Sequence, residues 1–509
     1  MRDQRRNAVR VFAVAGAVIL SLLFTATSVQ AQHRPLSQVL PELILREITL
    51  NSPPAPPGNP FGLPAGFTHL AHFSPLGANE LDNPAVGVVQ GFNGQMATQF
   101  STFPLGSSSG GLTYEFDPSV GTLRRSSSSF GPLFSERALT IGRRKLSAGF
   151  NYQRTSYSTF EGQNLDDGSI KFYLPHQDCC TVGGRPFMQP NGTRLNPPFE
   201  GDLVETALSL KATTHTAAVF ANYGVTNHWD VGLAIPFVRV NLDARVRARV
   251  LRLVTDARTA PPGLFTEEEI RTILNLHTLE LDNPDATRTV QHSGHAAGLG
   301  DIVLRTKYHF LRRAGGGLAA GLDLRLPTGD ENELLGAGGV QAKFLLIASS
   351  ERGRLGQHVN ISYTVAQGKV GGSFAGLASA PLPDEINYAG GVELVASKRL
   401  TVIGDILGRT LRGAGRLDLV SKKFEYNQPP VPGMPGPGCA GLAGFTCRTV
   451  SFDEFAPRSG DLRLMLGTGG VKFNLAGNLL VSASVLFPLT NAGLRSRITT
   501  MVGVDYVIK

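Results

Sequence analysis

Charged side chains recur at every second position in long segments of this 509-residue chain that are otherwise apolar. The stretch GLGDIVLRTKYHFL, residues 298–311, shows the pattern, because Asp301, Arg305 and Lys307 alternate with apolar and aromatic side chains. Side chains of a strand alternate between its two faces, so one face here is apolar and the other carries acids beside bases. Such a charged face can pair internally, face water or line a path for solutes.

Catalytic chemistry would need a nucleophile close to a base. His358, Asn360 and Ser362 share one face of a predicted strand, and His215 lies in another strand. A triad requires hydrogen-bond contact between nucleophile and base, whereas residues two apart on one strand lie roughly 7 Å apart. The one Gly-x-Ser-x-Gly match, GSSSG at 106–110, lies in a Gly- and Ser-rich stretch and not at an elbow between a predicted strand and helix. We therefore expect no enzymatic activity and keep an outer-membrane hydrolase with its site at the barrel rim only as a weaker alternative.

Metal and cysteine motifs are sparse. His292 and His295 form an HSGH motif that would bind a metal only weakly, so we expect no metal and no cofactor. The spacing of the four cysteines, Cys179, Cys180, Cys439 and Cys447, matches no zinc site, and four cysteines allow three pairings. We favour a loop disulfide between Cys439 and Cys447, or bridges between the two cysteine regions.

The first 31 residues read as a secretory signal peptide. Four arginines precede the apolar run VFAVAGAVILSLLFTATSV, and a small-residue site follows at Val29–Ala31. We expect cleavage after Ala31 and export of the remainder, which permits disulfides. The formal charge of +8 is not clustered, so we expect no nucleic-acid partner.

Period-two alternation dominates the chain from about residue 146 onward, and it predicts an all-β fold. Short turns and long loops alternate along the chain, which is typical of a transmembrane antiparallel β-barrel with its long loops outside. The predicted strands also exceed the usual five or six residues of globular proteins. A membrane-spanning sheet must close on itself, because lipid offers no hydrogen bonds. We predict about twelve strands: residues 146–160, 203–223, 229–250, 298–311, 316–327, 336–348, 356–368, 385–397, 400–414, 459–474, 478–488 and 494–508.

Several details of this barrel follow from local patterns. Fourteen strands are the alternative, if 111–117 and 123–130 join the wall. In 229–250 the apolar residues change from odd to even positions at Pro236, which predicts a bulge. The long loop 251–297 contains TEEEIRTILNLHTLEL, where Thr266 and Glu269 predict a capping box and a short amphipathic helix.

The segment 32–145 is irregular and partly rich in Pro, Ser and Gly. We expect it to be a plug inserted in the barrel or a periplasmic extension, whereas 146–509 form the barrel itself.

Charged residues of a barrel wall are expected to face the lumen, since a lipid-facing Arg or Lys at the midplane costs about 2–4 kcal/mol. The charges would line a wettable channel or pair and close the lumen. The predicted lumen-lining residues are Asp301, Arg305, Lys307, Asp323, Arg325, Lys343, Glu393, Asp405, Arg409, Asp461, Arg463, Arg495, Arg497 and Asp505.

Several motifs resemble the family of outer-membrane transporters named for the phenol meta-degradation pathway. These are GLGDIVLRTKYHFL, RLPTGDENELLGAGG, YGVTNHWDVGLAIPFVRV and the lead-in QFSTFPLGSSSGG…FGPLFSERALTIG. The resemblance extends over about 85–509. It implies an outer-membrane barrel that passes hydrophobic or aromatic compounds, and it carries no catalytic residues.

The sequence thus predicts a channel or facilitated-diffusion transporter for small molecules in the outer membrane of a Gram-negative bacterium. The alternative is a structural or adhesion barrel with a closed lumen. Expected partners are membrane lipid, lipopolysaccharide, a small solute and the barrel-assembly machinery. Arg245, Arg247 and Arg249 form a basic row toward the outer end, where they would steer anions, bind lipopolysaccharide phosphates or remain solvated.

Overall fold

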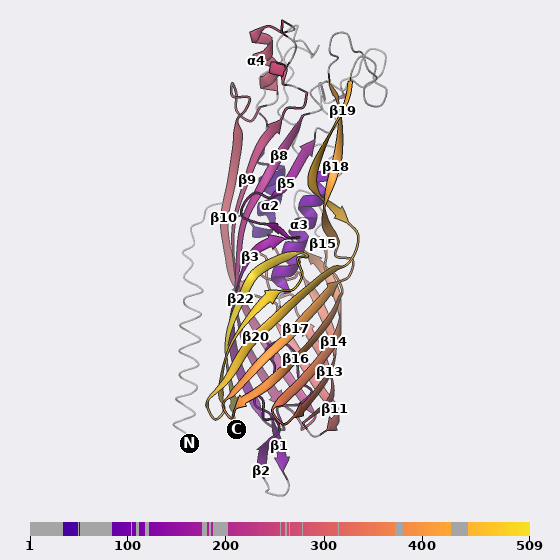
Figure 1. Ribbon diagram of the computed structural model, residues 1–509. Helices are drawn as coiled ribbons and strands as arrows, with labels where there is room; N and C mark the ends of the chain where they lie inside the picture. The colour runs from indigo at the N-terminus through magenta and orange to yellow at the C-terminus, as the bar shows by residue number, and fades with distance from the viewer. Residues whose placement is uncertain are drawn as a thin grey trace.

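Twelve antiparallel strands close into a barrel in the computed structural model (Figure 1). The wall follows chain order except where excursions intervene, and β8 pairs with β9 to close the ring. This confirms the predicted fold class and strand number. The structure describes residues 34–48, 50, 84–102, 104–107, 111–117, 122–175, 181–182, 185–186, 202–254, 256–259, 262–263, 265–276, 278–313, 315–371, 380–428 and 446–508.

The wall strands run in the ring order β9, β11, β12, β13, β14, β16, β17, β20, β21, β22, β3 and β8. Most begin and end within a few residues of the predicted bounds. They are β3 (Leu146–Phe160), β8 (Leu203–Gly224), β9 (Trp229–Leu251), β11 (Val303–Arg313), β12 (Gly316–Arg325), β13 (Gly339–Arg352), β14 (Leu355–Val370), β16 (Glu385–Ser397), β17 (Leu400–Leu411), β20 (Leu462–Ala476), β21 (Leu479–Pro488) and β22 (Leu494–Ile508).

The fourteen-strand alternative is wrong. β1 (Tyr114–Asp117) and β2 (Thr122–Arg125) pair only with each other, in a hairpin that projects beyond the short turns of the barrel (Figure 1). We call that end of the barrel the turn end, and we call the opposite end, which carries the long excursions, the loop end.

A second layer of strands, stacked on the loop end of the barrel and not packed against its face, continues the structure. It forms because β8 and β9 are about twice as long as a membrane crossing needs. Two predicted long loops, 251–297 and 415–458, are therefore partly wrong. The first ends in a strand that extends the sheet along β9, and the second is a hairpin. The added strands are β4 (Gln163–Asn164), β5 (Ile170–Pro175), β6 (Thr181–Val182), β7 (Arg185–Pro186), β10 (Thr287–Leu299), β15 (Ala380–Pro381), β18 (Arg416–Gln428) and β19 (Thr446–Arg458).

The bulge predicted at Pro236 is wrong as well. β9 pairs with β8 in unbroken register from Asp230 to Leu251. Its other neighbour changes from β11 to β10 at this level, leaving Pro236 outside both ladders and its carbonyl bonded to the amide of Gly300. The apolar residues change parity because the environment changes. Near the turn end they face outward, and beyond Pro236 they face an interior apolar core.

Helices fill the space enclosed by this second layer. α2 (Leu36–Leu45) packs on β9 and β10, and α3 (Pro84–Ser101) packs on β18, β19 and the loop end of the wall. α4 (Glu267–Leu276) lies at the far tip and confirms the predicted helix in an outer loop (Figure 1). Its capping box is formed, since the Glu269 carboxylate accepts from the Thr266 amide at 2.7 Å. Within the described residues, no helix has the length and apolarity of a membrane span.

Candidate functional site: the occupied lumen

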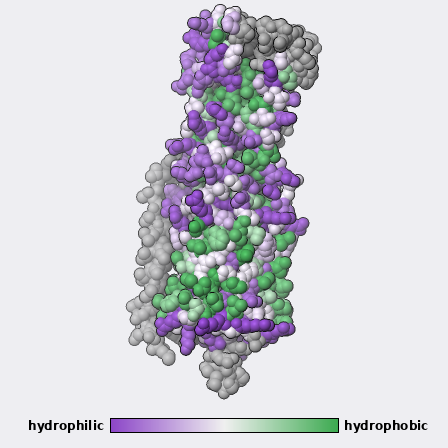
Figure 2. Space-filling model, in the orientation of Figure 1, coloured by the Kyte–Doolittle hydropathy of each residue, from purple (hydrophilic) through white to green (hydrophobic). Residues whose placement is uncertain are grey.

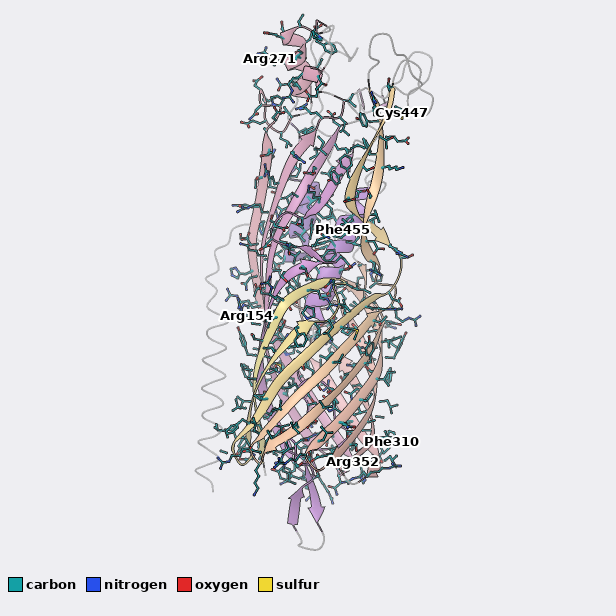
Figure 3. The ribbon with its side chains drawn as sticks, in the orientation of Figure 1. Arg154, Arg271, Phe310, Arg352, Cys447 and Phe455 are labelled. Atoms are coloured by element: carbon teal, nitrogen blue, oxygen red, sulfur yellow. The ribbon has the colours of Figure 1, made fainter. Side chains whose placement is uncertain are left out.

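Exposed apolar side chains form a belt on the outer face of the barrel toward its turn end, and Figure 2 shows one side of it. Phe310 on β11 points away from the barrel in Figure 3 and is 50% exposed. Trp229 is also exposed and its indole N–H donates to Thr306 at 2.7 Å. The belt includes Val219, Tyr223, Trp229, Leu304, Tyr308, Phe310, Phe344, Leu346, Val359, Ile361, Val392, Leu394, Val402, Ile406, Phe473, Val485, Phe487 and Val502.

Most of the predicted lumenal residues lie on the inner face. There, each charge must be neutralised by a partner, because a buried unpaired charge is costly. Eleven are buried in the wall or line internal cavities: Asp301, Arg305, Lys307, Asp323, Arg325, Lys343, Glu393, Asp405, Arg409, Arg495 and Asp505.

Three predicted lumenal residues are exposed instead. In β20 the inward positions are the buried Leu462 and Leu464, so Asp461 and Arg463 face outward, opposite to the predicted parity. Asp461 accepts the amide of Gly413 in a surface turn. Arg497 is turned outward because the ladder between β22 and β3 is irregular between Ser496 and Thr499.

The lumen is occupied by residues 126–141, which we call the lumenal segment. Asp405 on β17 holds it at one point. One carboxylate oxygen accepts the amides of Leu133 and Phe134 at 3.3 Å each, and the other accepts the Ser135 hydroxyl at 3.0 Å. His358 on β14 lies 2.6 Å from the same carboxylate. A buried wall residue thus binds the backbone of an inserted segment.

Two buried lysines bind carbonyls of the same segment. Lys472 on β20 donates to the carbonyl of Pro132 at 2.7 Å. Lys307 on β11 donates to the carbonyls of Arg137 and Leu139 at 3.1 and 3.0 Å. Together with Asp405, these lysines hold the lumenal segment through its main chain.

A central charge cluster adds a side-chain contact. Arg305 on β11 binds Asp323 on β12 through two hydrogen bonds of 2.6 Å and reaches Glu136 of the lumenal segment at 2.6 Å. Asn360 on β14 brackets Glu136, accepting its amide at 2.6 Å and donating to its carbonyl at 2.8 Å. Charge-assisted and paired bonds of this kind fix orientation strongly.

The end of α3 closes the lumen from the loop end. Arg325 donates to the carbonyl of Ser101 at 2.9 Å, and Arg409 donates to the carbonyl of Thr102 at 3.0 Å. Arg409 also pairs with Glu385 at 2.5 Å. These arginines bind the carbonyl end of a helix, where positive charge is stabilised.

A cavity of about 160 Å³ lies between the lumenal segment and the end of α3. Its lining combines apolar side chains, such as Phe134, Phe220 and Leu407, with charged Lys343 and Glu385. A volume of this size exceeds that of a few water molecules. The interior therefore contains an amphipathic chamber between the lumenal segment and the end of α3.

The rim-hydrolase alternative finds no support in the geometry. Both ring nitrogens of His358 face carboxylates, Asp405 at 2.6 Å and Glu393 at 3.3 Å. His215 is bonded to the Tyr152 hydroxyl at 2.6 Å. Among the described residues neither histidine is hydrogen-bonded to a serine.

The strand containing the HSGH motif places His292 and His295 on opposite faces of β10. They cannot converge on one ion from there. Cys447 at the start of β19 is disulfide-bonded, whereas Cys179, Cys180 and Cys439 lie outside the described residues, so the pairing stays a prediction.

Sequence reasoning missed several of these contact residues. Nothing in the sequence singled out Lys472 or Glu136, and the pattern suggested Asn360 only as part of a catalytic face, because their partners lie 169 to 340 positions away in the chain. The available signal was weak. A short Gly- and Ser-bearing stretch before a regular barrel pattern indicates only that the segment lacks strands of its own.

One family model resembles part of the chain. The family model described as "Putative MetA-pathway of phenol degradation" matches residues 185–371 and confirms the predicted resemblance there. No curated protein matches the chain.

Three solved structures are similar in part. The COG4313 outer membrane channel from Pseudomonas putida F1 is 8% identical, with a TM-score of 0.36 over 74% of this chain and 99% of that one. A Pseudomonas aeruginosa FadL homologue is 11% identical, with a TM-score of 0.28 over 78% and 94%. The Ralstonia pickettii toluene transporter TbuX is 10% identical, with a TM-score of 0.29 over 73% and 91%. At these identities, function must be argued from the residues of this chain.

Proposed function

We propose that this protein is an outer-membrane transporter for small molecules whose lumen is closed here by its own N-terminal region. The observation that carries the proposal is the polar attachment of the lumenal segment around an internal chamber. Asp405, Lys307 and Lys472 bind backbone groups of the segment, which water would bind equally well if the segment moved.

A purely structural barrel would be expected to have a different interior. Apolar side chains packed at close density would give it permanent stability without a chamber. Here the clusters of apolar residues around Leu133 and Phe134 are small and separate from the large core beyond the loop end. This favours a removable seal over a permanent filling, and the structural barrel remains the second candidate.

The cargo we propose is a small, largely apolar compound with a polar group. The chamber is lined by aromatic and aliphatic side chains next to Arg305, Arg409 and Glu385, and a binding site of this composition orients an apolar ligand by a few polar contacts. The family match over 185–371 and the toluene transporter among similar structures are consistent with it.

The cellular setting belongs to the same proposal. A belt of exposed apolar side chains on a closed antiparallel barrel is suited to the outer membrane. Export would use the predicted signal peptide, which lies outside the described residues. Assembly would use the barrel-assembly machinery, with β22 as the amphipathic last strand.

Solute flux tests the proposal. The purified full chain would be reconstituted in proteoliposomes and exposed to labelled solutes ranging from a small sugar to monoaromatic acids. We expect flux of at least one small solute above protein-free vesicles, with little background leak because the lumen is closed at rest. Equal flux in the two preparations for every solute would favour the structural barrel.

A further inference from the structure

The outer face of three neighbouring strands changes character at one level. Arg154 on β3 pairs in register with His215 on β8, and His215 pairs with Arg239 on β9, so the three side chains form one row across the sheet. We call it the boundary row. Figure 3 shows Arg154 where the barrel meets the strands that rise above it.

The row directly below the boundary row is apolar. Tyr152 pairs with Ala217, and Ala217 pairs with Phe237. From this row toward the turn end, the outward residues belong to the apolar belt, as Figure 2 shows by its green surface below and mostly purple surface above. The boundary row therefore lies where lipid tails end and polar headgroups begin.

The row directly above is neutral and rich in hydrogen-bonding groups. It contains Ser156, Thr213, Asn241 and His295 in register. Hydroxyl and amide side chains of this kind bind sugars and phosphate oxygens. The first outward carboxylate on β9 is Asp243, four residues beyond Arg239, and it accepts a bond from Ser293 at 3.1 Å.

Within the part of the chain that the structure describes, the cations of the boundary row have no acidic partner. Neither Arg154 nor Arg239 forms an ion pair with a described residue, and Arg239 only donates to Asn241 at 3.2 Å. Arg249, near the last residue of β9, differs because it pairs with Glu205 at 2.8 Å. Unpaired guanidinium groups at a fixed spacing next to lipid are suited to bidentate binding of phosphate.

We propose that the boundary row binds the phosphorylated sugar of lipopolysaccharide in the outer leaflet, with its acyl chains on the adjacent belt. Arg154 and Arg239 would contact a phosphate across His215, whose ring is held by the Tyr152 hydroxyl at 2.6 Å. Charge complementarity, continuity with the belt and the hydrogen-bonding row above favour this occupant over a free anion. The proposal rests on the outer-membrane setting and is independent of transport.

Lipid retention tests it. The full chain would be incubated with lipid A in detergent, exchanged, and analysed by mass spectrometry for lipid A per protein. The Arg154→Gln/Arg239→Gln variant should retain at least about tenfold less lipid A than wild type, since it loses both charge-assisted contacts to phosphate. Inorganic phosphate at millimolar concentration should not displace it, and phosphatidylglycerol should not replace it.

The matched control is Arg245→Gln/Arg247→Gln. It removes the same charge from the same face of β9, and neither arginine has an acidic partner among the described residues. It lies about 20–26 Å farther along β9, at roughly 3.3 Å per residue. We expect it to retain lipid A as wild type does.

Four results would overturn the proposal. The control variant could lose as much lipid A as the boundary-row variant, or the boundary-row variant could retain as much lipid A as wild type. Inorganic phosphate alone could release the lipid A, or the protein could retain phosphatidylglycerol equally well. If the glutamine variant fails to fold by heat-modifiable mobility, Arg154→Lys/Arg239→Lys replaces it. That variant keeps the charge but loses bidentate geometry, so intermediate retention is expected and wild-type retention would contradict the proposal.

Discussion

Arg305 on β11 and Glu136 of the lumenal segment form a 2.6 Å ion pair inside the barrel, and Arg305 keeps a second partner in Asp323. The wall charge thus remains compensated if the lumenal segment leaves. This asymmetry is suited to a seal, because the wall is stable in both states whereas the segment gains its contact only when inserted.

Glu136→Gln should therefore weaken the seal without unfolding the wall. Loss of one charge-assisted contact of about 1.5–3 kcal/mol would raise the open fraction about tenfold or more. Single-channel recording in planar bilayers measures this fraction. Glu268→Gln on the exposed face of α4 is the matched control, and equal behaviour of the two variants would contradict the role of Glu136.

Asp405→Asn should destabilise the folded barrel. The carboxylate is buried against His358 at 2.6 Å and accepts backbone amides of the lumenal segment. Removing one partner of a buried charged pair costs about 3–5 kcal/mol. Urea titration read by heat-modifiable gel mobility should show the lower midpoint, whereas Asp453→Asn on the exposed face of β19 should change little. Equal urea midpoints for Asp405→Asn and wild type would argue against a stabilising role of the Asp405–His358 pair.

The sheet above the loop end should respond to pH through Glu205, which lies well beyond the apolar belt. Burial acts to raise the pKa of Glu205, but Arg249 and Lys171 outweigh it and lower the pKa overall. Its stabilising effect is therefore present above the unfolded value, about 4.3, and is lost as pH falls through the folded pKa. Proteolysis of this region should accelerate below pH 4 in wild type, and the pH dependence should flatten in Glu205→Gln.

Tyr173 on β5 should make the stability of the same region depend on pH at the alkaline end. Burial raises the pKa of Tyr173, and the neighbouring Glu205 charge raises it further. Because its folded pKa exceeds the unfolded value, stability is retained below about pH 10 and is lost as pH rises through the folded pKa. Tyr173→Phe should remove the increase in proteolysis at alkaline pH. An unchanged increase would show that another group causes it.

The disulfide of Cys447 should link it to Cys439. A loop of this length gives about 2–3 kcal/mol by the chain-entropy model. A non-reducing digest followed by mass spectrometry should yield the joined peptides, and reduction should loosen the β18–β19 hairpin while the barrel persists. A peptide joining Cys447 to Cys179 or Cys180 would instead show a bridge between the two regions.

The barrel wall could be predicted because its strands are long and amphipathic. Residues 146–160 and 385–397 have the same bounds in the structure as in the prediction. The parity change at Pro236 was visible but was misinterpreted as a bulge, since a sequence does not distinguish a register change from a strand that leaves the membrane and enters an apolar core.

The sequence predicts a plug in 32–145 only as one of two alternatives, and the contacts of that plug could not be predicted. α3 is buried on several faces, including polar ones such as Asn93 and Thr98, so it has no apolar stripe of helical period. The lumenal segment forms no strand, and its partners are distant in the chain. Contacts such as Lys472 with Pro132 arise only once the barrel has closed.

A reversible disulfide between the N-terminal region and the wall tests whether that region seals the lumen. A Cβ placed on Gly106, in the lumen beside the lumenal segment, would lie 2.5 Å from the side-chain nitrogen of Asn151 on β3, so Gly106→Cys and Asn151→Cys are positioned to form a disulfide. Solute flux through reconstituted protein would be measured before and after reduction, with each single-cysteine variant as control. We expect the oxidised double variant to carry no flux and reduction to restore it, whereas equal flux in both states would contradict a lumen sealed by the N-terminal region.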